Sequence, residues 1–130
     1  MLAPLRAYNI AQAGDPHIRP VAILITAPDG KDEGGLWGRI AYDWLFIELL
    51  AVPEAARGHG LGRQLMDQAE TIARDAGCTG IWLDTYAFQA RGFYEKLGYA
   101  LFGTLNDYPA GHSRFFLQKR LPAHAASVDR

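Results

Sequence analysis

The chain has 130 residues, of which 49% are hydrophobic and 21% charged, a length and composition that suit one domain with a single core. Its formal net charge of −1 at pH 7 gives no reason to expect nucleic acid or a membrane as a partner, so any bound anion needs a local site. The lone Cys78 excludes an internal disulfide, and the lack of a signal peptide or of a membrane-spanning apolar segment predicts a reduced, cytoplasmic setting.

The first half of the chain predicts one helix followed by three strands. Residues 3–13 have helical character and end at the turn signal Gly14-Asp15-Pro16. A segment rich in β-branched residues at about 20–27 precedes a Pro-Asp-Gly turn, and two more strands are expected near 35–42 and 44–52. The last of these, WLFIELLAV, is apolar on both faces, which is typical of a central strand.

The second half alternates helices and strands. Apolar residues recur at helical spacing from Leu61 to Ala76, and Gly77 is placed to end that helix. GIWLDTY (80–86) predicts a strand, a short helix follows at about 88–97, and the segments 99–105 and 112–121 predict a hairpin. A strand-helix-strand unit has a right-handed crossover, so strands 44–52 and 80–86 should run parallel.

These elements together predict an α/β, or α+β, fold. It contains a single mixed, mostly antiparallel sheet of about six strands, with a central parallel pair and flanking helices. We expect residues 1–121 to form this one domain and residues 122–130 to form a flexible tail with little to bury.

The segment RGHGLGR (57–63) concentrates glycine and arginine at the expected start of the helix from Leu61. The first amide hydrogens of a helix are unpaired and carry partial positive charge. Three glycines expose that backbone and two arginines add charge, which predicts a phosphate or pyrophosphate site, although a glycine-rich turn that only starts a helix is the alternative. The Walker ending is absent, and the glycine spacing does not fit a dinucleotide fingerprint.

This loop resembles the Arg/Gln-x-x-Gly-x-Gly/Ala loop of the GNAT superfamily of N-acetyltransferases, and FYEKLGY (93–99) resembles that family's second signature. The resemblance covers about residues 20–121, and it extends to a group of small bacterial acetyltransferases. It implies a GNAT fold with a splayed parallel pair, and transfer of the acetyl group of acetyl coenzyme A directly to a primary amine of a small molecule or peptide. A homodimer is compatible with this reading.

The resemblance also implies which residues contact acetyl coenzyme A. The backbone of residues 50–52 should pair with the pantetheine arm like an added strand, with the Val52 amide facing the thioester oxygen. The loop should hold the pyrophosphate, with the His59 side chain mostly in solvent, and the second signature should add further contacts. The predicted cofactor-binding residues are Leu50, Ala51, Val52, Arg57, Gly58, His59, Gly60, Leu61, Gly62, Arg63, Phe93 and Lys96.

Three features depart from the family pattern. The chain starts too late for a full first strand, Ala87 stands where asparagine is often found, and Pro53 comes one residue early. The alternative to an enzyme is therefore a non-catalytic acyl-coenzyme A sensor or a partner-dependent subunit that kept the cofactor cleft.

Two residues are candidates for the proton transfers of amide formation. Tyr94 resembles the family's general acid, and a phenol with a pKa of about 10 can protonate a thiolate, although a core tyrosine is the alternative. Glu48 shares its predicted strand face with apolar residues, so we expect it to be partly desolvated with a raised pKa, as a general base requires. An ion pair between Glu48 and an arginine is the competing prediction.

The acceptor side of the site is predicted from aromatic residues. Tyr86 and Phe88 are expected to line it, while most other aromatic side chains fill the core. No group of histidine and cysteine has metal spacing, so no metal is expected, and Cys78 is predicted to be a small buried residue rather than a nucleophile.

Overall fold

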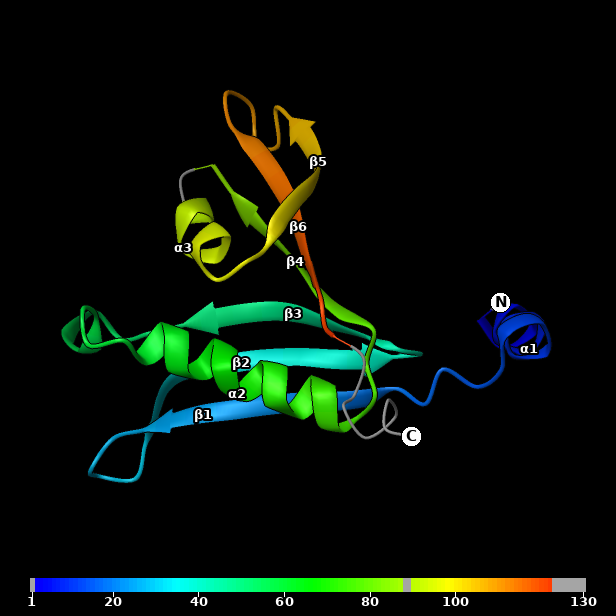
Figure 1. Ribbon diagram of the computed structural model, residues 1–130, viewed down its shortest axis with the longest axis horizontal. Coiled ribbons are helices and arrows are strands. Elements are labelled where there is room, and N and C mark those ends of the chain that lie inside the picture. Colours follow the sequence, from blue (N-terminus) through cyan, green and yellow to red (C-terminus); the bar gives the residue numbers. More distant parts are fainter. Residues whose placement is uncertain (1, 88–89, 123–130) are drawn as a thin grey trace.

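A computed structural model describes residues 2–87 and 90–122, and Figure 1 shows its helices and strands. In chain order the elements are α1 (Leu2–Ala13), β1 (Arg19–Thr26), β2 (Asp32–Ala41), β3 (Trp44–Ala51), the 3-10 turn η1 (Glu54–Ala56), α2 (Leu61–Asp75), β4 (Gly80–Tyr86), α3 (Arg91–Lys96), β5 (Ala100–Asn106) and β6 (Ser113–Arg120). Each predicted helix and strand is present. Phe88 and residues 123–130 of the predicted tail lie outside the described residues.

The six strands form one mixed sheet in the order β1-β2-β3-β4-β6-β5. β3 and β4 run parallel, and every other neighbouring pair is antiparallel. The predicted meander, parallel pair and final hairpin are therefore confirmed, and with them the fold class.

The parallel pair is short, and its end opens the sheet. β3 and β4 pair only from Trp44 with Gly80 to Ile47 with Leu83. Beyond that point β3 continues against β2 while β4 continues against β6, so the sheet separates into two arms (Figure 1). The space between the arms is where a ligand can reach the backbone of both strands.

A β-bulge in β3 coincides with this separation. Ile47 pairs with Gly38 of β2 and Leu49 pairs with Trp37, so Glu48 is an extra residue without a partner in that ladder. A bulge bends its strand and increases the local twist. The bulge therefore turns β3 away from β4 at the residue where their pairing ends.

The core lies between the sheet and α2, which crosses one face of the first arm, formed by β1, β2 and β3 (Figure 1). α2 buries Leu65, Met66, Ala69 and Ala73 on the side that faces the sheet. The largest side chains with almost no exposed surface come from five different elements: Leu36, Leu45, Met66, Ile81, Leu83 and Leu117. Packing around the parallel pair thus fixes the closed end of the two arms.

α1 projects from the rest of the molecule at the end of the sheet where β1 begins (Figure 1). Its Leu5, Tyr8 and Ile10 side chains are exposed. Within residues 2–87 and 90–122, no helix is both long enough and apolar enough to cross a membrane.

Candidate active site

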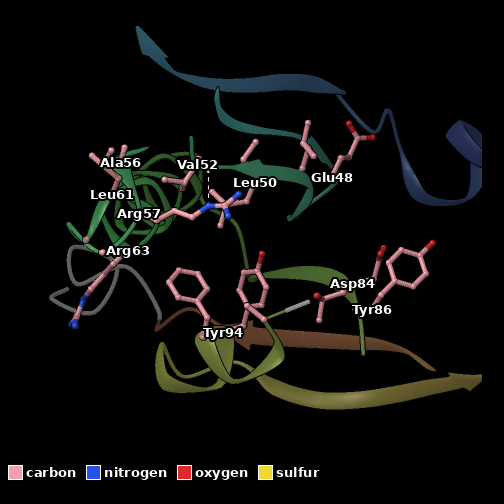
Figure 2. Close-up of a pocket in the computed structure, with 18 residues that line it drawn as sticks. Glu48, Leu50, Val52, Ala56, Arg57, Leu61, Arg63, Asp84, Tyr86 and Tyr94 are labelled. Carbon is pink, nitrogen blue, oxygen red and sulfur yellow. Dashed lines mark hydrogen bonds between the residues drawn. The ribbon is translucent and has the colours of Figure 1, made fainter. Parts of the chain in front are cut away.

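A cleft of about 1020 Å³ lies between the two arms (Figure 2). The end of β3, the glycine loop with the start of α2, the end of β4, and α3 all contribute to its lining. It brings together most of the predicted site residues: Glu48, Leu50, Ala51, Val52, Arg57, Gly58, Gly60, Leu61, Gly62, Arg63, Tyr86, Phe93 and Tyr94. The predicted cofactor residues His59 and Lys96 are not part of this lining, and Phe88 lies outside the described residues.

The glycine loop has a backbone conformation that favours glycine. Gly58 and Gly60 have φ angles of 87° and 78°, in the left-handed region. Gly60 is the N-cap of α2 and supplies no side chain to pair the first amides of the helix. A Cβ atom added at Gly58 or Gly60 would meet no heavy atom within 4 Å, so the backbone there faces open space. This arrangement can accept an anion.

Gly62 differs from the other two glycines. A Cβ atom at this position would lie 3.2 Å from Cζ of Phe93 in α3. Gly62 therefore allows the start of α2 to approach α3, in addition to any contact with a ligand. The sequence had suggested only ligand access for all three glycines, and the packing role of Gly62 was missed because Phe93 is 31 residues away in the chain.

The two arginines of the loop extend in different directions. Nε of Arg57 donates to the carbonyl oxygen of Val52 at 3.2 Å, which holds the guanidinium inside the cleft beside the end of β3 (Figure 2). Arg63 points away from Arg57 in the same view. Both side chains add positive charge near the N-terminus of α2, where the helix dipole also favours an anion.

The hydroxyl group of Tyr94 points into the cleft from α3 (Figure 2). Its ring packs edge-on against Phe93 and Tyr99, with centroids 5.1 and 6.2 Å away. Burial raises the pKa of Tyr94 above its usual value, and the negative charge of Asp84 raises it further. Tyr94 therefore keeps its proton at neutral pH and can act as a donor.

The expected partial burial of Glu48 is wrong. Its side chain is 41% exposed and forms an ion pair with Arg39 of β2, as the competing prediction had it. The bulge explains the error, because it changes the alternation of side chains along β3. Leu50 pairs with the buried Leu36 and so lies on the face covered by α2, whereas Glu48 reaches Arg39 on the opposite face.

Asp84 is a carboxylate of the cleft that sequence reasoning missed. It follows Leu83, the last residue of β4 that pairs with β3, and it lies on the opposite arm from Glu48 (Figure 2). Arg114 of β6 donates from Nε to Oδ1 of Asp84 at 3.1 Å, and Nη2 forms an ion pair with Oδ2 at 2.9 Å. A single charged residue within the strand GIWLDTY was the available signal.

Arg114 also orders the aromatic side chains beyond Asp84. Its guanidinium lies 5.5 Å from the ring centroid of Tyr86 and 5.0 Å from that of Tyr108. The hydrogen bond from Arg114 to Asp84 raises the pKa of the guanidinium. Tyr86 thus lines the cleft next to a fixed ion pair, and its contact with an acceptor stays a prediction.

Two further sequence predictions concern groups outside the cleft. Cys78 is buried and free, and burial raises the pKa of its thiol, as expected for a packed residue rather than a nucleophile. Among residues 2–87 and 90–122, no three side chains of histidine, cysteine, aspartate or glutamate are grouped so that they could hold a metal ion.

Comparison with known proteins relates both the sequence and the fold to acetyltransferases. The family model described as "Acetyltransferase (GNAT) family" matches residues 11–99. The acetyltransferase Atu2258 of Agrobacterium fabrum is 41% identical over 117 residues, which cover 90% of this chain and 85% of that protein. The blasticidin-S acetyltransferase of Streptomyces morookaense is 41% identical over 107 residues, 79% of each chain. An acetyltransferase structure from Bacillus cereus ATCC 14579 has a TM-score of 0.85 and 36% identity, covering 92% of this chain and 88% of that chain.

Proposed function

This chain belongs to the GNAT family of acetyltransferases, and we propose that it transfers the acetyl group of acetyl coenzyme A directly to a primary amine of a small molecule or peptide. One observation carries the proposal. A single cleft joins the open backbone of Gly58 and Gly60 at one end to the Tyr94 hydroxyl and two carboxylates at the other.

The residues that would hold acetyl coenzyme A fit its parts. β3 loses its parallel partner after Ile47, so one backbone edge of residues 50–52 faces the cleft and can pair with the pantetheine arm like an added strand. The unpaired amides at the start of α2, with Arg57 and Arg63, suit a pyrophosphate. The bound thioester would supply the activated acetyl group.

Tyr94 is the proposed proton donor to the departing thiolate. Its hydroxyl lies in the cleft, and its raised pKa keeps it protonated at the pH where the reaction proceeds. Glu48 is the proposed acceptor, through solvent, of the proton that the amine must lose, and its exposure is consistent with transfer through water. Asp84 is the competing carboxylate because it also lines the cleft, on the opposite arm.

The relatives suggest which acceptor amines to test first. One of them is a blasticidin-S acetyltransferase, so blasticidin S belongs in the first panel of candidate acceptors, with polyamines, aminoglycosides and peptides that have a free N-terminus. The test follows thiol release from acetyl coenzyme A with each amine, and mass spectrometry checks that the amine gains one acetyl group. Calorimetry measures acetyl coenzyme A binding in parallel.

The outcomes of this test separate an enzyme from a binding module. Amine-dependent thiol release together with an acetylated product supports the proposal. Tight binding of acetyl coenzyme A without release for any amine would instead support the non-catalytic sensor. If acetyl coenzyme A does not bind, the assignment of the cleft is wrong.

A further inference from the structure

Lys119 of β6 connects three elements at a point outside the lining of the cleft. Its Nζ atom donates to both carboxylate oxygens of Glu70 at 3.0 Å and to the carbonyl oxygen of Leu97 at 2.8 Å. An ammonium group has three donors, so these three bonds use all of them. Glu70 belongs to α2, and its side chain is only 10% exposed. Leu97 is the C-cap of α3.

The two helices that Lys119 connects carry different parts of the proposed site. The glycine loop forms the N-terminal end of α2, and Tyr94 lies on α3. α2 crosses the first arm of the sheet, whereas α3 lies beside the second (Figure 1). A fixed distance between these helices is therefore a fixed distance between the loop and the Tyr94 hydroxyl.

α3 packs against the core through Phe93, Tyr94 and Leu97, and Lys119 adds a polar contact at its C-terminal end. The helix has six residues and no side-chain hydrogen bond at its N-cap. At its C-terminal end, the amides of Leu97 and Tyr99 both donate to the carbonyl oxygen of Tyr94, at 3.0 and 3.1 Å. A Cβ atom at Gly98 would lie 3.4 Å from Cε of Lys119, so this turn is in contact with the lysine stem. The bond from Lys119 to Leu97 thus anchors the same turn that is bonded to Tyr94.

We propose that Lys119 is a positioning residue that anchors the end of α3 to Glu70 of α2 and so fixes Tyr94 relative to the glycine loop. The inference rests on the proposed role of Tyr94 as proton donor. Loss of the anchor would let α3 shift while the cofactor loop keeps its own structure. Chemistry would then be impaired more than acetyl coenzyme A binding.

The test separates anchoring from simple stabilisation. Lys119→Met alone leaves the buried Glu70 carboxylate without its main partner and is expected to destabilise the fold. The double variant Glu70→Met/Lys119→Met removes both charges and keeps unbranched apolar side chains, so its thermal melting should stay close to wild type. It still lacks the bond to Leu97. Lys119→Arg keeps the positive charge and N–H donors in a planar group of different shape, and serves as the charge-conserving control.

Hydrogen exchange of backbone amides tests the anchor without any acceptor amine. In the double variant, amides of residues 97–99 should exchange faster by on the order of tenfold, while amides of α2 exchange as in the wild type. With an amine from the acceptor panel, kcat should fall by on the order of tenfold or more, with the Kd for acetyl coenzyme A little changed. Lys119→Arg should retain both properties.

Contrary results overturn the inference in a recognisable way. Wild-type exchange at residues 97–99 in the double variant would show that Lys119 does not hold α3, whether or not an acceptor is known. Faster exchange with unchanged kcat would show that the anchor has no catalytic consequence. Failure of the proton-donor role is a separate result, namely wild-type turnover of Tyr94→Phe with wild-type exchange in α3.

Discussion

At the scale of single residues, the proton donor is the most direct assignment to test. Tyr94→Phe keeps the ring and its edge-on contacts with Phe93 and Tyr99, so folding and acetyl coenzyme A binding should be retained. The rate should fall by roughly ten- to ten-thousandfold, the range expected when a general acid is removed. Steady-state rates, measured where chemistry limits turnover, and calorimetry provide the two readouts. Wild-type turnover of the variant would leave water or coenzyme A itself as the proton source.

Asp84 should control the pH range over which Tyr94 works. Burial is the larger cause of the raised Tyr94 pKa, and the Asp84 charge adds to it. A general acid is active while protonated, so raising its pKa moves the alkaline loss of activity to higher pH. Asp84→Asn removes that charge and leaves Arg114 without its counter-ion, and both changes favour the ionised phenol.

The alkaline limb of the pH–rate profile should therefore shift to lower pH in Asp84→Asn. The comparison with wild type uses one acceptor and saturating acetyl coenzyme A. A limb that stays in place or moves to higher pH would show that Tyr94 does not set it.

Glu48 and Arg39 provide a matched pair of substitutions. If Glu48 accepts the proton of the amine, Glu48→Gln should lower turnover most at low pH, where most of the amine is protonated, and Arg39→Gln should not reproduce that profile. Because the ion pair is largely exposed, either change should cost less than about 1 kcal/mol of stability. The pH dependence of the rate tests the role in proton transfer, and urea unfolding tests the loss of stability. If both variants change the pH–rate profile equally little, the ion pair has only a structural role.

At the scale of elements, the start of α2 is where an anion should bind, and Gly60 allows a clean test of charge. Asparagine and aspartate both tolerate the left-handed conformation of this residue better than other side chains do. A Cβ atom there meets nothing within 4 Å, so the two variants should fold alike. Gly60→Asp should weaken acetyl coenzyme A binding much more than Gly60→Asn does, because only the aspartate repels the phosphates. Equal affinities by calorimetry would contradict a pyrophosphate site at this helix end.

The elements were predictable because their signals are local. The apolar run of β3, the helical stripe of α2 and the apolar strand 80–86 each follow from residues close in sequence, and Gly77 marks the end of α2. The β-bulge is different. Glu48 becomes an unpaired residue only because Gly38 and Trp37 pair with the residues on either side of it. The sequence of β3 alone does not show this register between β2 and β3.

The same distinction explains which residues of the cleft were predicted from the sequence. The glycine loop and Tyr94 belong to motifs with a fixed spacing, so sequence alone places them in one site. Asp84 acquires its place from pairing between β4 and β6, through Arg114, which lies 30 residues further along the chain. The face on which Glu48 lies depends on the bulge. Long-range register, rather than residue type, was the missing information.

At the scale of the whole molecule, stability and pH are connected through Tyr94, which lines the cleft, and the buried Tyr99. Tyr99 is 3% exposed, and its hydroxyl has no hydrogen-bond partner among the described residues. Burial raises its pKa well above the usual value, and the charge of Glu70 adds to this effect. Tyr94 is shifted in the same direction. Both phenols therefore remain neutral in the folded protein at a pH where they would ionise in the unfolded chain.

The sign of the resulting pH dependence follows from proton binding. Below the unfolded pKa of about 10, both states hold these protons and the contribution to stability is fully present. As the pH rises above about 10, the unfolded chain releases protons that the folded protein keeps, so stability falls by up to about 1.4 kcal/mol per pH unit for each tyrosine. Tyr99→Phe removes one of the two groups. Urea unfolding at about pH 8 and about pH 11 should show a smaller loss of stability in this variant than in the wild type. At the lower pH the variant should be as stable as the wild type or more so, because it no longer buries an unpaired hydroxyl.

Tyr8→Phe, at a side chain that is 63% exposed, is the control and should leave the alkaline loss of stability unchanged. An equal alkaline loss in the Tyr99→Phe variant and the wild type would show that the Tyr99 hydroxyl ionises as readily in the folded protein as in the unfolded chain.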